Sequence, residues 1–166
     1  MIEIKKLNGN DLPAVRRVMD IVRGSLANDS WFIPMSEETM DDMFSCDTTL
    51  TVYGAYDDDV LAAIALIDTD VNEMADLTTA MKLPSNTGGE LGACVVLPEY
   101  RGQHLMHLVC SRLVSVAKDM GLAYLVASAH PDNVASNRSL KKLGMEYKQT
   151  LVRGEKFLRN AYCLLL

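Results

Sequence analysis

The chain has 166 residues, of which 49% are apolar and 23% charged, and its net charge at pH 7 is −6. This length suits a single domain over residues 1–166, whose core needs no disulfide or metal for its stability. The acidic balance excludes a global basic field, so we expect no nucleic-acid partner. No apolar run approaches the ~18 residues of a membrane helix, and the charged N-terminal segment lacks the apolar core of a signal peptide. We therefore expect a cytoplasmic protein without membrane contact.

Metal and redox sites are also disfavoured by the sequence. The four cysteines are far apart and form no C-x-x-C pair: Cys46, Cys94, Cys110 and Cys163. This spacing favours free, largely buried thiols in a reducing compartment. His104 and His107 are three residues apart, but no third ligand accompanies them, so we expect no metal. We interpret His107 as an exposed helix residue.

The first half of the chain combines short strands with short helices. Alternation predicts a first strand, and Asn10-Asp11 followed by Pro13 predicts the start of a helix. Ser36 caps a short second helix, and an acidic turn then joins two strands. The segment from Asp68 to Gly89 is long and mostly loop-like, with one or two helical turns between Asp70 and Met81. The three expected strands are Ile2–Lys5, Leu50–Tyr56 and Val60–Ile67.

The second half shows a clearer pattern of apolar residues. We expect a strand, a long helix, a strand buried on both faces, a helix and two antiparallel strands. Their ranges are Leu91–Leu97, Leu105–Met120, Leu122–Ala129, Asn133–Gly144, Met145–Val152 and Phe157–Leu166. The apolar run Tyr162–Leu166 either finishes a core strand or forms the edge of a homodimer. The whole order predicts a mixed sheet packed with helices.

The most informative stretch runs from Val95 to Met106. A strand stops at Pro98, the chain turns at Arg101-Gly102, and a helix follows. The first four amides of a helix lack acceptors and lie at the positive end of its dipole, so they bind anions well. Gly102 lets the backbone approach a ligand closely, and Arg101 adds a charged donor. The stretch therefore predicts a local anion site on an acidic protein.

Two segments of the chain resemble the GCN5-related N-acetyltransferase (GNAT) superfamily. The first is Leu97-Pro98-Glu99-Tyr100-Arg101-Gly102-Gln103-His104, which resembles the signature of the family. The second runs from His130 to Met145 and resembles a later helix with asparagine, small residues and then Leu-Gly. The order of the elements matches too, so the resemblance covers essentially the whole chain. It implies an α/β (α+β) fold, with a mixed, mostly antiparallel sheet of six to seven strands flanked by about four helices.

The resemblance also implies acetyl-CoA as co-substrate, held without a metal. It places the pantetheine on backbone groups of Cys94 and Val96, and the pyrophosphate on the amides of the turn. Asn133 and Ser136 would complete the coenzyme site. The residues of the turn are Arg101, Gly102, Gln103, His104, Leu105 and Met106.

For catalysis, the resemblance implies Glu90 as the general base, acting through water, and a backbone amide near Val95 as the oxyanion donor. The alternative for Glu90 is a solvated residue at the end of a strand. Trp31 and Phe32 would line the acceptor pocket, and a plain core role is the alternative for both.

Three positions depart from the family's pattern. His104 and Met106 stand where the phosphate loop usually has small residues, and we expect Met106 either to pack inward or to limit how the pyrophosphate binds. If the backbone at His104 needs no positive φ, the residue is tolerated and can contact phosphate itself; if it does, the coenzyme binds weakly. Leu140 stands where many members have a tyrosine that protonates the leaving thiolate. This form of the helix is similar to that of the ribosomal-protein N-terminal acetyltransferase branch.

The resemblance predicts an N-acetyltransferase that moves an acetyl group from acetyl-CoA to a primary amine, on a small molecule or a peptide N-terminus, by direct attack. The three departures favour an alternative, an acyl-CoA-binding module with little or no transfer activity. A transferase of longer acyl groups is a third reading. The acceptor itself has no pattern in this sequence.

Overall fold

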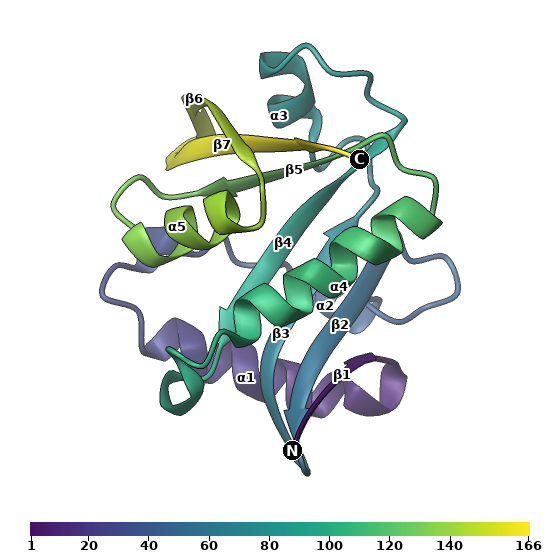
Figure 1. The fold of residues 1–166 in the computed structure, drawn as a ribbon, viewed down its shortest axis with the longest axis vertical. Helices are drawn as coiled ribbons and strands as arrows, with labels where there is room; N and C mark the ends of the chain where they lie inside the picture. Colours follow the sequence, from purple (N-terminus) through teal and green to yellow (C-terminus); the bar gives the residue numbers. More distant parts are fainter.

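The computed structural model describes all residues from 1 to 166 and contains seven strands and five α-helices (Figure 1). The strands are β1 (Ile2–Lys6), β2 (Leu50–Asp57), β3 (Val60–Asp68), β4 (Gly88–Val96), β5 (Tyr124–Ala129), β6 (Glu146–Arg153) and β7 (Phe157–Leu165). The helices are α1 (Leu12–Gly24), α2 (Glu37–Asp41), α3 (Ala75–Ala80), α4 (Leu105–Asp119) and α5 (Val134–Lys142). The expected mixed, mostly antiparallel sheet with flanking helices is confirmed.

All strands belong to one sheet, in the order β1-β2-β3-β4-β5-β7-β6. Every neighbouring pair is antiparallel except β4 and β5, which are parallel. Strand β7 lies inside the sheet, between β5 and β6, and Tyr162 and Cys163 are buried. The run Tyr162–Leu166 therefore finishes a core strand, while β1 and β6 form the two edges of the sheet.

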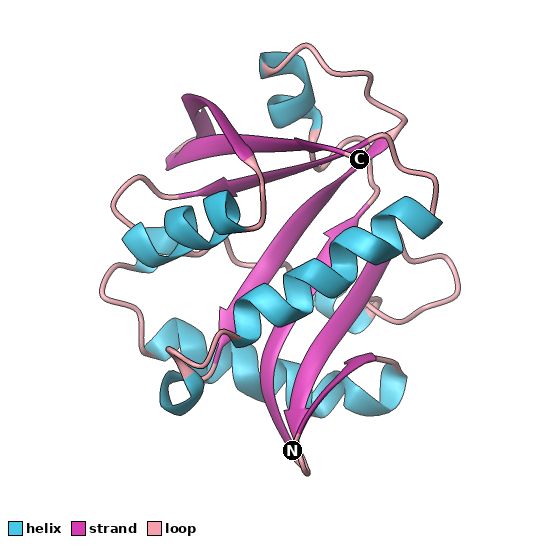
Figure 2. Cartoon of the chain, viewed as in Figure 1, coloured by secondary structure: helices cyan, strands magenta, loops and turns pink.

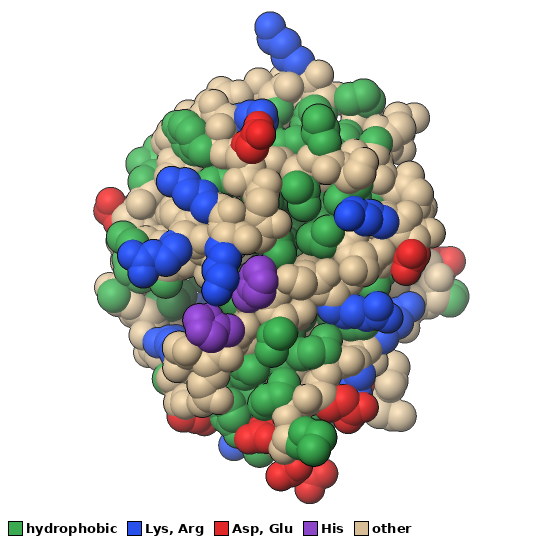
Figure 3. Space-filling model, in the orientation of Figure 1, with side chains coloured by type: hydrophobic (Ala, Val, Ile, Leu, Met, Phe, Trp, Pro, Cys, Tyr) green, Lys and Arg blue, Asp and Glu red, His purple; other side chains and the backbone are tan.

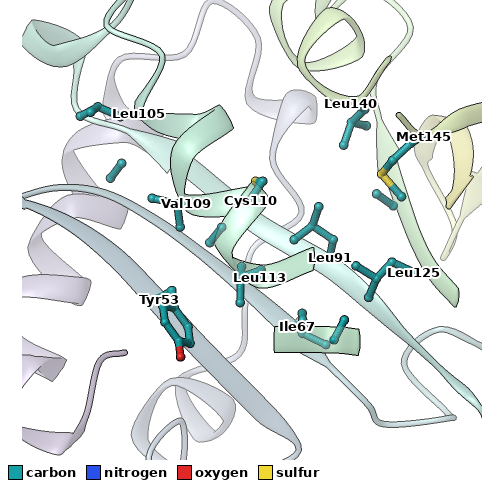
Figure 4. Packing of buried hydrophobic residues seen from close by; sticks show 14 of the residues in the cluster. Tyr53, Ile67, Leu91, Leu105, Val109, Cys110, Leu113, Leu125, Leu140 and Met145 are labelled. Atoms are coloured by element: carbon teal, nitrogen blue, oxygen red, sulfur yellow. The ribbon is translucent and has the colours of Figure 1, made fainter. Parts of the chain in front are cut away.

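Helices cover both faces of the sheet (Figure 2). Helices α4 and α5 lie on the near face in this view, and α1 and α2 lie behind the sheet. One buried cluster joins α4 to the sheet through Leu105, Val109 and Leu113, and Figure 4 shows Val109 and Leu113 on the side of α4 toward Tyr53 and Ile67. A second cluster joins α1 to β2, β3 and β4, and a third joins α3 to β5 and β7. Successive residues on the central strands therefore point into different clusters, according to the face of the sheet on which they lie.

Local chemistry places the ends of the helices where the sequence predicts them. Pro13 lies in the first turn of α1, the Ser36 hydroxyl accepts from the Thr39 amide, and the Asn133 carboxamide accepts from the Ser136 amide. These contacts satisfy donors that the first turn of a helix leaves free. The helical turns expected between Asp70 and Met81 are α3. Strand β4 begins at Gly88, three residues before the expected start, because Gly88 and Gly89 pair with β5.

Gly88 is placed where no side chain fits. A Cβ at this position would lie 2.1 Å from Cε2 of the Tyr124 ring, which is buried against it. This contact lies at the start of the parallel pairing between β4 and β5. The close approach of the two strands therefore depends on the missing side chain.

We expect Gly88→Ala to lower the free energy of unfolding by about 1–3 kcal/mol, because the added methyl group must displace the Tyr124 ring. Gly92→Ala, on the same strand, is the matched control, since its Cβ would meet only Leu66 Cδ1, at 3.9 Å. Urea denaturation of both variants measures the difference. Equal midpoints would show that the Tyr124 ring adjusts without cost.

Candidate active site

The site begins where two parallel strands separate. Pairing between β4 and β5 covers only Gly88–Glu90 and Tyr124–Val126, after which the strands diverge, as Figure 1 shows. The outer edges of both strands remain paired, β4 with β3 and β5 with β7. The facing edges therefore present backbone donors and acceptors to the gap rather than to another strand. A cavity of about 1320 Å³ occupies this region and reaches residues on both faces of the sheet.

The turn before α4 forms a cradle of free amides. The six amides from Gly102 to His107 donate to no backbone acceptor, and no side chain caps the helix. Gly102 and His104 both have left-handed backbone, with φ of 81° and 63°. Consecutive amides in such a turn converge on one point and form an anion site, which the helix dipole strengthens. The free amides that the sequence predicts before this helix are therefore present.

The backbone at His104 resolves the alternative that the sequence left open. Its φ of 63° lies in the left-handed region, which costs a side-chain-bearing residue about 1 kcal/mol relative to glycine. The position therefore has the conformation in which glycine is favoured, and a histidine occupies it. Met106 packs inward as expected, against the cluster under α4 and near the Cys110 thiol.

Most of the residues that sequence reasoning assigned to the site lie on the cavity wall. The cavity is lined by Trp31, Phe32, Glu90, Cys94, Val95, Val96, Arg101, Gly102, His104, Leu105, Met106, Asn133 and Ser136. Gln103 is exposed and does not line it. Leu105 contributes through its backbone, because its side chain is buried under α4. The guanidinium of Arg101 donates to the Ser25 hydroxyl at 2.7 Å, which ties the turn to the end of α1.

A bulge in β4 turns successive residues toward the two faces of the sheet. Three steps along β4, from Gly92 to Val95, oppose two steps along β3, and Ala93 has a φ of 48°. An extra residue of this kind bends the strand and re-aims its groups. Cys94 and Val96 pack on the α4 side, whereas Val95 belongs to the cluster on the α1 side. Sequence reasoning missed this bulge, because Ala93 carries no turn signal.

On the α1 side, Glu90 is held in an ion pair with Arg153. Arg153 donates to both oxygens of Glu90, and its Nη1 also donates to the Ser128 hydroxyl. The same guanidinium contacts Asp76 twice, with Nε to Oδ2 at 2.8 Å. The Glu90 side chain is 16% exposed and that of Arg153 10%. Glu90 is thus a buried, oriented carboxylate and not the solvated strand-end residue of the alternative reading.

The surroundings of Glu90 favour proton uptake. Burial raises the pKa of Glu90 above its ordinary value, and the negative charges of Asp76 and Asp68 act in the same direction. The Arg153 guanidinium opposes this rise in the pKa but does not cancel it. A carboxylate with a raised pKa is a stronger base than an exposed one, as general-base catalysis requires.

Charge is segregated across the cavity. The carboxylates on its wall all come from segments on the α1, α2 and α3 side: Glu38, Asp42, Asp47, Asp68, Asp70, Glu73, Asp76 and Glu90. The only cations on that side are Arg153 and Arg159, whereas the turn and helices on the α4 side contribute Arg101, His104, His107 and Lys142. Figure 3 shows this second face, where histidine and cationic side chains meet near its centre and acidic side chains lie toward the periphery. One mouth of the cavity therefore suits an anion and the other a cation.

The N-terminus of α5 completes the α4 side of the cavity. Asn133 uses its side-chain oxygen as a helix cap, and Ser136 and Ser139 follow it on the cavity wall. Leu140 also lines the cavity and is 8% exposed, within the cluster that includes Met145. The position at which many family members have a tyrosine acid is therefore on the cavity wall, and its leucine side chain offers no proton.

The expectation that His107 is an exposed helix residue is wrong. Its Nδ1 is buried without a partner, and its Nε2 lies 3.5 Å from the Ser111 hydroxyl. The residue lines the cavity because the first turn of α4 faces the diverging strands. No group of three histidine, cysteine or acidic side chains is arranged to hold a metal ion. None of the helices is long and apolar enough to cross a membrane.

Two functional candidates escaped sequence reasoning, Arg153 and Arg159. Both lie on the last hairpin, and both are at least nine-tenths buried by residue. The alternation of side chains along β6 and β7 could have indicated them, because it places both arginines on the same face of the sheet as Leu151. A buried arginine at an inward strand position marks a specific contact, but only the sheet order shows that Glu90 lies opposite.

Comparison with known proteins identifies the family. The model of the acetyltransferase (GNAT) domain family matches residues 10–146, most of the chain. The chain therefore belongs to the GNAT family of acetyltransferases. Among curated proteins no sequence match was found.

Solved structures of acetyltransferases share the fold over nearly the whole chain. An N-acetyltransferase from Staphylococcus aureus Mu50 superimposes with a TM-score of 0.76 at 18% identity, covering 99% of this chain and 98% of that one. YncA from Salmonella typhimurium, solved with its cofactor acetyl-CoA, superimposes with a TM-score of 0.75 at 17% identity, covering 99% of this chain and 93% of that one. The ribosomal-protein-S18-alanine N-acetyltransferase from Escherichia coli superimposes with a TM-score of 0.73 at 17% identity, covering 99% of this chain and 94% of that one. At these identities the likeness concerns the fold.

The strain in the turn can be tested with a pair of opposite substitutions. We expect His104→Gly to raise the free energy of unfolding by about 1 kcal/mol and Gly102→Ala to lower it by a similar amount. A Cβ at Gly102 would meet no atom within 4 Å, so only backbone strain acts there. Thermal unfolding of the two variants checks both signs, and a destabilised His104→Gly would contradict the strain.

Proposed function

We propose that this protein transfers the acetyl group of acetyl-CoA to a primary amine by direct attack of the amine on the thioester. The observation that carries the proposal is the cradle of free amides before α4, which opens onto a cavity running through the divergence of β4 and β5. The family match supports acetyl transfer as the general reaction. The nature of the amine is inferred from the site.

The α4 side of the cavity suits the coenzyme. The amides from Gly102 to His107 would hold the pyrophosphate, and no Cβ at Gly102 blocks its approach. Cys94 and Val96 lie in the part of β4 beyond its pairing with β5, where a pantetheine amide can pair with the backbone as a strand would. Asn133 and Ser136 line the far side of the same groove. Arg101 and Lys142 add positive charge to this mouth.

The α1 side suits an amine. Eight carboxylates on its wall attract a cationic group, which must lose a proton before it can attack, since an alkylamine has a pKa near ~10.4. Glu90 is the proposed acceptor of that proton, directly or through water. Arg153, whose Nη1 also donates to Ser128, orients the carboxylate, and an amide near Val95, beside the bulge at Ala93, would stabilise the developing oxyanion. Trp31 and Phe32 border the acceptor.

A second candidate function is a coenzyme-binding module without transfer. It is favoured by the imidazole at His104, on left-handed backbone in the phosphate cradle, and by Leu140, which offers no proton to the leaving thiolate. The missing acid slows turnover at pH 7 rather than abolishing it, because a thiol with pKa ~8.5 lies only about 2 kcal/mol from its thiolate. Transfer therefore stays the favoured function.

Titration calorimetry with acetyl-CoA, followed by an amine panel read by release of the coenzyme thiol, tests the two functions. We expect binding in the micromolar range and thiol release with at least one primary amine. Binding without release across the panel would instead establish the binding module. Absence of binding at high micromolar concentration would contradict both.

The raised pKa of Glu90 predicts an acid limit to the reaction. As pH falls, Glu90 takes up a proton and can no longer accept one from the amine, so kcat/KM falls at a pH above the ordinary carboxyl pKa of ~4.3. We expect Glu90→Gln to lower kcat about 100-fold at neutral pH and to remove that acid limb. The pH profile of thiol release measures both effects.

Glu99→Gln is the matched control, because Glu99 is an exposed carboxylate outside the cavity. It should retain the rate and the pH profile of the unmodified protein. An unchanged acid limb in Glu90→Gln would assign the base to another group.

A further inference from the structure

Arg159 is a buried cation with an unused donor. The residue is 2% exposed, and its Nη1 donates to the Leu158 carbonyl at 2.8 Å. Its Nη2 is buried and has no hydrogen-bond partner. The guanidinium also lies over the Phe157 ring, with Cζ 5.4 Å from the centroid. These contacts hold the side chain in place but leave part of its donor set unsatisfied.

Arg159 also lacks an anion. None of the ion pairs in the structure includes it, whereas Arg153, on the same hairpin, binds both Glu90 and Asp76. Buried charges in proteins are ordinarily paired, since burial removes their hydration. Burial and the positive charge of Arg153 lower the pKa of Arg159 to about 10. A negative group is thus missing from the surroundings of this side chain.

Arg159 lies on the wall of the cavity, so a negative group bound to it would come from a ligand in that cavity. The last pair between β5 and β7 joins Ala129 to Asn160, so Arg159 lies one residue beyond the paired part of β5. Its partner on β6 is Leu151, which packs in the cluster under α3. Arg159 therefore lies on the sheet face that carries Glu90, and it lines the cavity together with Arg153 and Phe157.

The other unsatisfied atoms support this interpretation. Only three buried side-chain nitrogen or oxygen atoms in the protein lack a partner, and they belong to Trp31, His107 and Arg159. All three residues line the same cavity. Trp31 and Arg159 can only donate, so the ligand of this cavity must bring acceptors.

We propose that Arg159 binds the carboxylate of the acceptor, so that the acceptor is an amine that also carries a carboxylate, such as a free amino acid. This inference rests on the proposed acetyl transfer. A carboxylate matches the planar donor fork of a guanidinium. A phosphate dianion would meet the full repulsion of the acidic wall, whereas an amino acid brings an ammonium for that wall and one negative charge for Arg159.

Matched pairs of acceptors test the carboxylate. Each common amino acid is compared with its own carboxamide, which keeps the amine and the side chain but lacks the negative charge. We expect the best amino acid to exceed its amide in kcat/KM by about 10- to 100-fold, with the difference mainly in KM. In Arg159→Gln the ratio of acid to amide should fall to about one. The reactivity of each amine cancels when these ratios are compared between variants.

Two further variants control the experiment. Arg17→Gln removes an exposed arginine outside the cavity and should keep the ratio of the unmodified protein. Arg159→Lys retains the charge without the fork, and should give a ratio reduced about tenfold even if Arg159→Gln fails to fold. Calorimetry with acetyl-CoA verifies that each variant is folded.

The outcomes separate this inference from the proposed function. If amines release thiol but Arg159→Gln leaves the acid-to-amide ratio of kcat/KM unchanged, the carboxylate site is overturned and acetyl transfer still stands. Equal losses with the acid and the amide would show that Arg159 acts only in packing. Failure of every amine and every amino acid to release thiol would overturn both.

Discussion

The divergence of β4 and β5 is the constraint on which the site depends. Two parallel strands that stayed paired to their ends would leave no path through the sheet, and every backbone group between them would be consumed. Here the pairing stops after Glu90 and Val126, while β3 and β7 hold the outer edges in place. The bulge at Ala93 then lets neighbouring residues of one strand serve opposite faces of the sheet. A single rigid sheet thus separates two binding regions and joins them at one point.

Charge distribution explains how an acidic protein can bind an anionic coenzyme. The protein has a net charge of −6, and the carboxylates of the cavity are concentrated on the wall formed by α2, the end of β3 and the segment around α3. The opposite mouth relies on backbone amides, whose partial charges are independent of composition. The two mouths therefore suit opposite ligands, and the proposed zwitterionic acceptor would use the acidic wall and the buried guanidinium of Arg159 together.

Sequence reasoning found what local chemistry determines and missed what only the sheet order determines. The amide cradle, the helix caps and most strands follow from short segments with clear signals, such as Pro98, Gly102 and Asn133. The left-handed φ at His104 could be raised as an alternative only from the family's pattern, because the residue there is not glycine. Arg153 and Glu90 are 63 residues apart, and their contact requires β7 to pass between β5 and β6. Sequence periodicity predicts the face of each residue but not its neighbour across the sheet.

The interior position of β7 also bears on how the protein assembles. This strand follows all the others along the chain, yet it must enter between two of them, where it pairs with β5 on one side and β6 on the other. During synthesis, the sheet consequently stays incomplete until β7 emerges from the ribosome. Glu90 cannot form its ion pair with Arg153 before then, because β6 joins the sheet only through β7. A premature stop within the last hairpin would leave an exposed edge on β5 and a bare carboxylate beside it. Such a product is prone to aggregation and degradation, so the Glu90–Arg153 ion pair and the completed sheet form together.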